Sequence, residues 1–196
     1  MAVVFQFDLK STLAAITFIA SKNVPELTKY KLCKLLFLAD KYHLVKYGRI
    51  ITGDKYCALP HGPIPSRTLN ILNAVISEDL RDEASTVLAG AIELDRGFVN
   101  PRFHAQKVLE GEELSQSDIL ALQRVIDEYG QMGFDELKAI THEMFAYKQA
   151  WNERPEGAKG IDMDFEAFFE EDSDAVVGAR DAMLEDHFLR SSHPVF

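Results

Sequence analysis

The chain has 196 residues, 47% of them hydrophobic and 27% charged, which is the mixture of an ordinary globular protein. No stretch approaches the roughly 18 apolar residues of a membrane span, and no small-residue cleavage site follows a basic start. These features argue against a membrane protein and against a secreted protein. They predict a single soluble, cytoplasmic domain that is large enough to bury a core without disulfides or metal ions.

The net charge of −10 is distributed unevenly along the chain. Residues 1–70 carry 10 Lys and Arg against 4 Asp and Glu, whereas residues 71–196 carry 11 against 27. A chain with this balance repels phosphate, so nonspecific binding to nucleic acid is not expected. Two interpretations stay open: the two segments neutralise each other in the fold, or a basic surface lies beside an acidic one and steers a charged protein partner.

The first predicted element is a helix that Asp8 can cap, with an apolar stripe at helical spacing. The stripe consists of Leu9, Leu13, Ile16 and Ala20. A second helix is predicted over residues 26–47, and Gly48 should end it. Apolar residues occupy most of its circumference, so it should lie at the centre of the domain. Lys34 and Lys41, which share one face, mark the side that we expect to reach solvent.

The next segment does not continue the helical pattern. Gly53 and Asp54 favour a turn, residues 55–59 are short and extended, and the prolines of residues 61–65 prevent a helix. We therefore expect an ordered loop between helices. Ser66 then caps a third predicted helix. Its apolar face consists of Leu69, Leu72 and Ile76.

Residues 77–90 are charged and weakly patterned, which predicts a short helix or a loop. Residues 91–95 then alternate apolar and polar, residues 96–97 favour a turn, and Phe98 begins a second extended piece. This order predicts a β-hairpin.

Ser115 and Asp118 resemble a capping box at the start of the most clearly amphipathic helix. The stripe of this helix consists of Ile119, Leu122, Ile126 and Tyr129. After Gly130 and Gly133, a further helical stripe consists of Leu137, Ile140, Met144, Tyr147 and Trp151. The acidic remainder predicts two more helices, and their apolar residues are Phe165, Phe168, Phe169, Val177, Leu184 and Phe188. For the three phenylalanines at 165–169, core packing is favoured over a binding role.

No residue pattern specifies catalysis. His142 and Glu143 begin a zinc-protease helix motif, but Ala146 stands where the motif requires its second histidine. Cys33 and Cys57 belong to no metal spacing, and they are typical of small core residues in a reducing compartment. The chain has no serine-nucleophile elbow and no phosphate-binding glycine loop. We therefore expect no metal, no cofactor and no enzymatic activity.

Two blocks of the sequence resemble the Panacea, or SocA-like, antitoxin domain. The first block consists of residues 34–40, His43, Leu44, residues 47–49, residues 54–58 and residues 61–66. The second block consists of the helix of residues 120–129, followed by Leu137, Thr141, His142 and Trp151. The order of helix, Gly-Arg pair, extended piece and Gly-Pro-x-Pro-Ser turn makes the first block the more specific of the two.

The resemblance implies a mainly helical domain over residues 1–152, with a small β element beside the central helix. Residues 153–196 are expected to form an acidic helical extension packed on the same domain. The implied function is that of an antitoxin, which neutralises a cognate toxin by direct protein contact and, in at least one member, delivers it to a cytosolic protease. A homodimer stays open. The candidates for partner contact are Lys34, Asp40, His43, Arg49, His61, Gly62, Pro63, Thr141, His142 and Trp151.

Two alternatives come from other functional classes. A small ligand-binding domain or metal-dependent enzyme would use His61 and His142 in a pocket beside the proline-rich turn. A DNA-binding regulator would use the basic N-terminal third, and its binding to duplex DNA would weaken steeply with salt.

Overall fold

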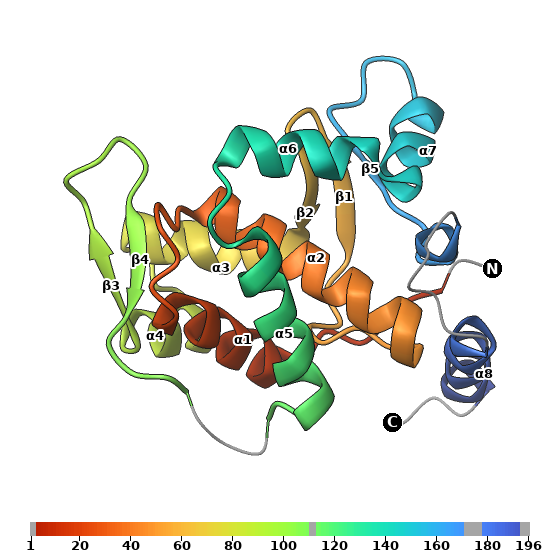
Figure 1. Cartoon of the computed structure of the whole chain (residues 1–196), viewed down its shortest axis with the longest axis horizontal. Helices are drawn as coiled ribbons and strands as arrows, with labels where there is room; N and C mark the ends of the chain where they lie inside the picture. The colour runs from red at the N-terminus through yellow and green to blue at the C-terminus, as the bar shows by residue number, and fades with distance from the viewer. Residues whose placement is uncertain (1–2, 110–112, 171–177, 193–196) are drawn as a thin grey trace.

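The computed structural model describes residues 3–109, 113–170 and 178–192. Its mainly helical architecture with a small β element confirms the predicted fold class (Figure 1). The central helix is α2, over Lys29–Tyr47. The helices packed against it are α1 (Leu9–Ser21), α3 (Ser66–Ser77), α5 (Gln116–Tyr129), α6 (Phe134–Glu143) and α8 (Ala179–Ser192). Among the described residues, no helix is both long and apolar enough to cross a membrane.

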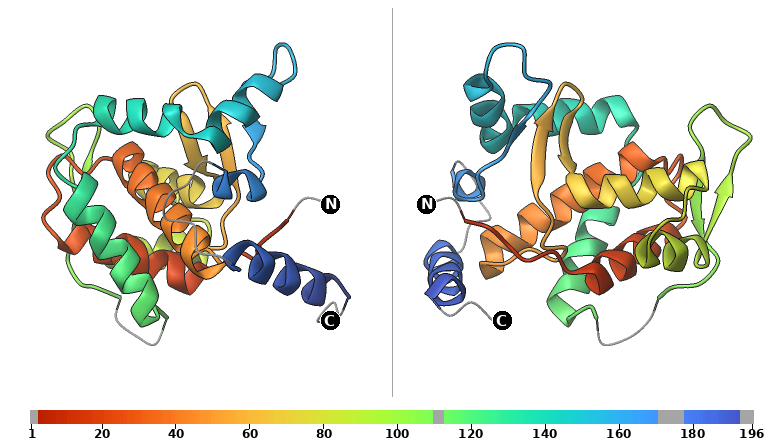
Figure 2. Two further views of the ribbon diagram at one scale, coloured as in Figure 1. Left: turned by 45° about the vertical axis from the view of Figure 1, so that its right-hand side comes forward. Right: turned by 180° about the vertical axis from the view of Figure 1, so that it is seen from behind.

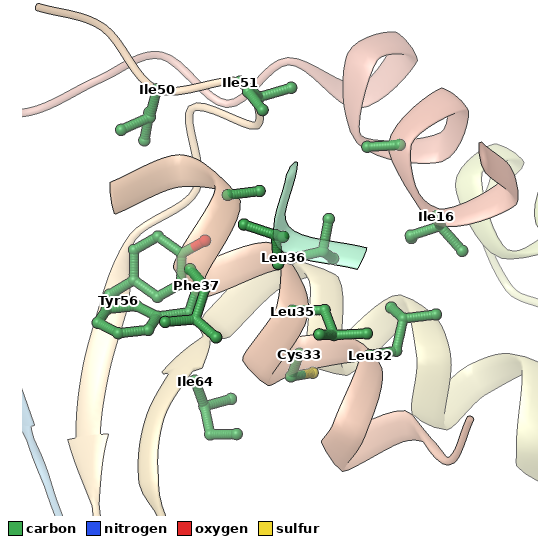
Figure 3. Packing of buried hydrophobic residues seen from close by; sticks show 14 of the residues in the cluster. Ile16, Leu32, Cys33, Leu35, Leu36, Phe37, Ile50, Ile51, Tyr56 and Ile64 are labelled. Carbon is green, nitrogen blue, oxygen red and sulfur yellow. The ribbon is translucent and has the colours of Figure 1, made fainter. Parts of the chain in front are cut away.

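Helix α2 is buried on nearly all sides, as predicted from its apolar circumference. It begins at residue 29 and not at 26, because Glu26 has a left-handed backbone (φ 52°) and the hydroxyl of Thr28 accepts the N–H of Lys31. Gly48 ends it in the left-handed conformation. Figure 3 shows its apolar side chains meeting those of α1 and of the strands that follow α2. The labelled core residues are Ile16, Leu32, Cys33, Leu35, Leu36, Phe37, Ile50, Ile51, Tyr56 and Ile64.

The prediction that Lys34 and Lys41 mark a solvent-facing side of α2 is wrong for Lys34. Its side chain is 0% exposed, whereas Lys41 is half-buried. The helical period placed both residues on one face, but the hairpin that follows α2 covers the part of this face near Lys34. Burial of a lysine is costly unless its amine is hydrogen-bonded, so the surroundings of Lys34 matter for the site described below.

The expected loop after α2 is a β-hairpin. Strands β1 (Tyr56–Leu59) and β2 (Gly62–Pro65) pair antiparallel, and β5 (Ile161–Asp162) joins β1 on its other side. The two prolines of β2 favoured a loop, because proline cannot donate to a ladder. Here β2 is an edge strand, where proline is tolerated.

The second hairpin is confirmed. Strand β3 (Ile92–Asp95) pairs with β4 (Arg102–Ala105), so the second strand begins four residues after Phe98. The segment before it contains α4 (Glu83–Ala89), which Asp82 caps through the N–H of Ser85. Figures 1 and 2 show this hairpin at the edge of the molecule, with β4 beside α1 and β3 outermost.

The stripe from Leu137 to Trp151 belongs to two helices and not to one. Met144 is extended (ψ 137°) and separates α6 from α7 (Phe145–Glu153). Both helices have the predicted apolar side, but the break turns α7 toward the β1–β2 hairpin (Figure 1). Periodicity alone did not reveal the break, because the apolar spacing continues across it.

Within the described residues, the C-terminal part of the chain contributes Met163, Phe165, Phe168 and Met183 to the core cluster. The first of its two expected helices is a single turn, η1 (Glu166–Phe169), and the second is α8. Phe165 and Phe168 are 4% and 1% exposed, which confirms core packing for them. Helix α8 lies against the end of α2, where a Cβ on Gly48 would be 2.6 Å from the carbonyl oxygen of Ala179. Val177 lies outside the described residues.

Candidate partner-binding site

Five candidate residues from three elements, α2, β2 and α6, meet at the tip of the β1–β2 hairpin. Lys34 reaches up from α2, and its Nζ donates to the carbonyl oxygen of Pro63 at 3.1 Å. Gly62 has a φ of +96°, and a Cβ built on it would lie 2.2 Å from that Nζ. The same position is 3.1 Å from Cδ2 of His142 and 3.1 Å from Oγ1 of Thr141. We name this group the hairpin cluster: Lys34, Gly62, Pro63, Thr141 and His142.

The hairpin cluster disfavours positive charge on its own basic groups. Burial, together with the charge of Lys138, lowers the pKa of Lys34 to about 7. Burial also lowers the pKa of His142, and the neighbouring Lys34 adds to the effect. Nε2 of His142 is buried and has no hydrogen-bond partner among the described residues. The cluster is therefore a weakly charged contact that connects α2 and α6 to the hairpin.

Replacement of Gly62 by alanine should lower the free energy of unfolding by about 3 kcal/mol, from left-handed strain plus overpacking. The amine of Lys34 could retreat only by breaking its hydrogen bond to Pro63, because the side chain is enclosed. Urea denaturation followed by circular dichroism measures the loss. Gly157→Ala is the matched control, since Gly157 also has a positive φ (79°) but nothing lies within 4 Å of its Cβ position. Equal losses in the two variants would show that the contacts around Gly62 carry no cost.

A stack of rings extends from the hairpin cluster along α7. The rings of His142 and Tyr147 are 4.4 Å apart and those of Tyr147 and Trp151 are 5.9 Å apart, both nearly parallel. The guanidinium of Arg154 lies 3.7 Å from the ring of Trp151 and continues the stack. The hydroxyl of Tyr147 donates to the carbonyl oxygen of Leu59 at 2.9 Å. The half-buried Trp151 is thereby held in a fixed orientation beside the hairpin.

A second group ties the end of α2 to the start of α5. Nδ1 of His43 is 2.9 Å from the carbonyl oxygen of Arg49, and its Nε2 is 3.0 Å from Oγ of Ser117. Oδ1 of Asp118 lies 3.1 Å from His43 Nε2 and 2.8 Å from Nη2 of Arg49. Burial lowers the pKa of His43. Asp118 also closes the predicted capping box with Ser115, which is confirmed.

Asp40 lies at the centre of a third, fully buried group. Its Oδ1 accepts the N–H groups of Ile51 at 2.7 Å and Thr52 at 3.2 Å. Its Oδ2 accepts the hydroxyl of Tyr56 at 2.7 Å and the hydroxyl of Thr52. Burial raises the pKa of Asp40 to about 6, although these hydrogen bonds favour the ionised form. Asp40 thus fixes the segment that leads from α2 into β1.

The role of Asp54 is not apparent from the sequence. Its carboxylate accepts the N–H groups of Arg67 at 3.1 Å and Thr68 at 2.8 Å, and also the hydroxyl of Thr68. Ser66, the predicted cap, is the first residue of α3 and makes no such bond. Helix α3 is therefore capped from a position 13 residues earlier in the chain, which spacing rules for local caps do not detect.

The candidate residues differ in their accessibility. Lys34, Asp40, His43 and Thr141 are 0% exposed, so they act within the fold and not at its surface. Of the others, His61 is exposed at the hairpin tip, the side chain of Arg49 is 45% exposed and Trp151 is half-buried. Tyr147, Asp118 and Arg154 were not candidates, although their contacts orient those that were. The apolar stripe of residues 137–151 was the one signal that included Tyr147.

The charged halves of the sequence are partly joined in the fold. Arg49 of the basic segment pairs with Asp118, and Lys55 pairs with Asp162 at 2.5 Å. Within residues 3–109, 113–170 and 178–192, no group of three or more His, Cys, Asp or Glu side chains has the arrangement of a metal site.

Comparison with known proteins gives one match. The model of the antitoxin SocA-like, Panacea domain family matches residues 32–151, which is 120 of the 196 residues and includes all ten candidate residues. No curated protein and no solved structure matches the chain. The matched part begins in α2, contains both hairpins and ends in α7, so it includes all three polar groups described above. The chain therefore belongs to the Panacea domain family of SocA-like antitoxins.

Proposed function

We propose that the protein neutralises a cognate toxin protein by direct contact, with no covalent bond made or broken. The single observation that carries the proposal is the family match over 120 residues. The geometry of the candidate residues supports it, because the polar atoms of the most buried ones are engaged with the protein itself. Asp40 receives four hydrogen bonds and Lys34 donates to a backbone carbonyl, which suits a rigid scaffold.

The accessible candidates are the ones that we assign to toxin contact. His61 lies at the hairpin tip, Arg49 at the end of α2 and Trp151 on α7. Tryptophan and arginine often contribute most of the binding free energy at interfaces. Asp118 orients Arg49 and Tyr147 orients Trp151, so little conformational entropy of these two side chains would be lost on binding.

Coexpression with a toxin tests this proposal. Each gene that neighbours the antitoxin gene is induced alone and together with it, and growth and copurification are measured. The expected result is that one neighbour stops growth when alone, and that the antitoxin restores growth and copurifies with that product. If no neighbour is toxic, or if the toxic one is neither rescued nor copurified, the proposal is wrong.

We further propose that the bound toxin is either masked or delivered to a cytosolic protease, and its lifetime separates these modes. Delivery predicts that coexpression shortens the half-life of the toxin, and that deletion of the protease restores the half-life. Masking predicts an unchanged half-life with full rescue of growth. A pulse-chase measurement of the toxin in both hosts distinguishes the two.

We propose that residues 1–152 form the toxin-neutralising domain and that residues 153–196 are an acidic extension packed on it. The extension contributes β5 to the sheet and α8 to the end of α2. Residues 151–196 carry 12 acidic and 4 basic residues, so the extension has a net charge of −8.

A further inference from the structure

The β3–β4 hairpin has one covered edge and one open edge. On the covered side, the N–H of Phe103 in β4 donates to the carbonyl oxygen of Leu27 at 2.8 Å. Arg102 and Thr28 lie opposite each other there as an isolated antiparallel β-bridge. On the other side, β3 is the outermost strand of the molecule (Figures 1 and 2). Edge strands of this kind can pair with a strand from another chain.

The hairpin register tells which backbone groups point outward. The N–H of Phe103 faces away from β3, so the N–H and C=O groups of its neighbours Arg102 and His104 face β3. There Arg102 pairs with Asp95, and His104 pairs with Glu93. The bond from Gln106 N–H to the carbonyl oxygen of Ala91 continues this alternation. The N–H and C=O of Leu94 therefore point out of the hairpin. They have no hydrogen-bond partner among the described residues.

The surroundings of this edge are acidic. Residues 77–97 contain six carboxylates against two arginines. Both arginines are already paired, Arg81 with Asp79 and Arg96 with Glu78. Glu93 and Asp95 of β3 are exposed on either side of Leu94. A strand that pairs with β3 would thus place its alternate side chains directly opposite two carboxylates.

The same carboxylates argue against a second copy of this chain as the occupant. If two β3 strands paired antiparallel about Leu94, Glu93 of each would lie opposite Asp95 of the other. Shifting the register so that Leu94 pairs with Ile92 would place Glu93 opposite Glu93. Like charges directly opposite each other on a sheet are destabilising. An occupant with basic side chains at alternate positions would instead place opposite charges across from Glu93 and Asp95, which stabilises the pairing.

We propose that β3 is a docking edge for an extended segment of the partner protein that carries lysine or arginine at alternate positions. This inference rests on the proposed function in one respect, since it takes that partner to be the toxin. The hairpin tip extends the docking edge with apolar surface, because Phe98 is 45% exposed and Val99 fully exposed. Phe98 is held there by the guanidinium of Arg102, 3.5 Å from its ring.

The first test uses the full-length protein and a short capped peptide in which lysine and valine alternate. Addition of the peptide should slow hydrogen exchange of the Leu94 amide by about tenfold or more. The amides of Arg102 and His104 should not change, because they are already bonded within the hairpin. A peptide with glutamate in place of lysine should have no effect. If the lysine peptide leaves Leu94 unprotected, or if the glutamate peptide protects it equally, the proposal is overturned.

Charge reversal provides the variants. Glu93→Lys combined with Asp95→Lys should weaken binding of the lysine peptide by about tenfold, as measured by fluorescence anisotropy. Asp181→Lys combined with Glu185→Lys on α8 changes the net charge equally and should leave the affinity unchanged. Leu94→Pro removes the outward N–H and should also weaken binding, provided that its circular dichroism spectrum is native, since the Leu94 side chain packs against the core. Equal losses in both reversal variants would reduce the effect to net charge and overturn the proposal.

The toxin assay separates this inference from the proposed function. If the unaltered protein rescues growth, the Glu93→Lys, Asp95→Lys variant should lose copurification and rescue. If that variant rescues as well as the unaltered protein does, the docking edge is refuted while the antitoxin function stands. If the unaltered protein rescues no neighbour's toxicity, the proposed function fails, and the peptide measurements alone decide whether β3 is a docking edge.

Discussion

Replacement of Asp40 by alanine should lower the free energy of unfolding by about 3–5 kcal/mol, because it leaves several buried donors without an acceptor. The N–H groups of Ile51 and Thr52 cannot turn elsewhere, since the backbone holds them. The hydroxyl of Tyr56 is also fully buried. Urea denaturation measures the loss, and a folded protein at low denaturant concentration should keep its helical circular dichroism spectrum.

Two further variants make this result specific. Asp8→Ala removes the N-cap of α1, a single hydrogen bond to the N–H of Ser11, and should cost only about 1 kcal/mol. Asp40→Asn should cost less than Asp40→Ala, because the amide oxygen can still accept both N–H groups and the two hydroxyls can rotate to accept from its NH₂ group. A loss for Asp40→Ala no larger than that for Asp8→Ala would contradict the central role of this carboxylate.

Asp40 also makes a predictable contribution to the pH dependence of stability. Its pKa in the folded protein is raised to about 6 from an ordinary value of 3.8, so the folded state holds the proton more tightly than the unfolded chain does. Stability from this group is therefore present below pH 4 and is lost as the pH rises to about 6. The Asp40→Asn variant should lack this loss.

Replacement of Lys34 by methionine should remove a rise in stability between pH 7 and pH 10. Burial lowers the pKa of Lys34 from 10.5 to about 7, so between these values the unfolded chain binds a proton that the folded protein does not. The free energy of unfolding of the natural protein therefore increases with pH across this window, by roughly 4–5 kcal/mol in total. Below pH 7 the folded protein bears the full cost of a buried charge.

The measurement is a series of urea denaturations at pH 6, 7.5 and 9 on both proteins. The difference in unfolding free energy between Lys34→Met and the natural protein should be most in favour of the variant at pH 6, and it should shift toward the natural protein as the pH rises. Lys159→Met, at an exposed position, is the control. A difference that does not change with pH would mean that the amine of Lys34 is not desolvated in the folded protein.

These expectations bear on how the family motif is to be understood. Lys34, Asp40 and His43 lie on three successive turns of α2, and each is bonded to a different later segment of the chain. Lys34 meets β2, Asp40 meets the approach to β1, and His43 meets the start of α5. The motif thus specifies how one helix is connected to its surroundings, and the accessible His61 and Arg49 lie directly beside two of those connections.

The sequence by itself determined the helices and several of their ends. The cap of α1 at Asp8, the capping box of α5 and the stop at Gly48 are local interactions, between residues at most four apart, so the sequence carries them directly. The apolar circumference of α2 likewise placed it at the centre. The family resemblance covered the residues that the family model matches.

Tertiary structure alone decided the rest. Periodicity reports which residues share a face but not what covers that face, which is why Lys34 was expected in solvent although the hairpin buries it. The cap of α3 by Asp54, the pairing of β5 with β1 and the break at Met144 depend on residues distant in the chain or on packing between elements. Such contacts stabilise the folded state only when the whole fold brings the segments together, so no local pattern predicts them.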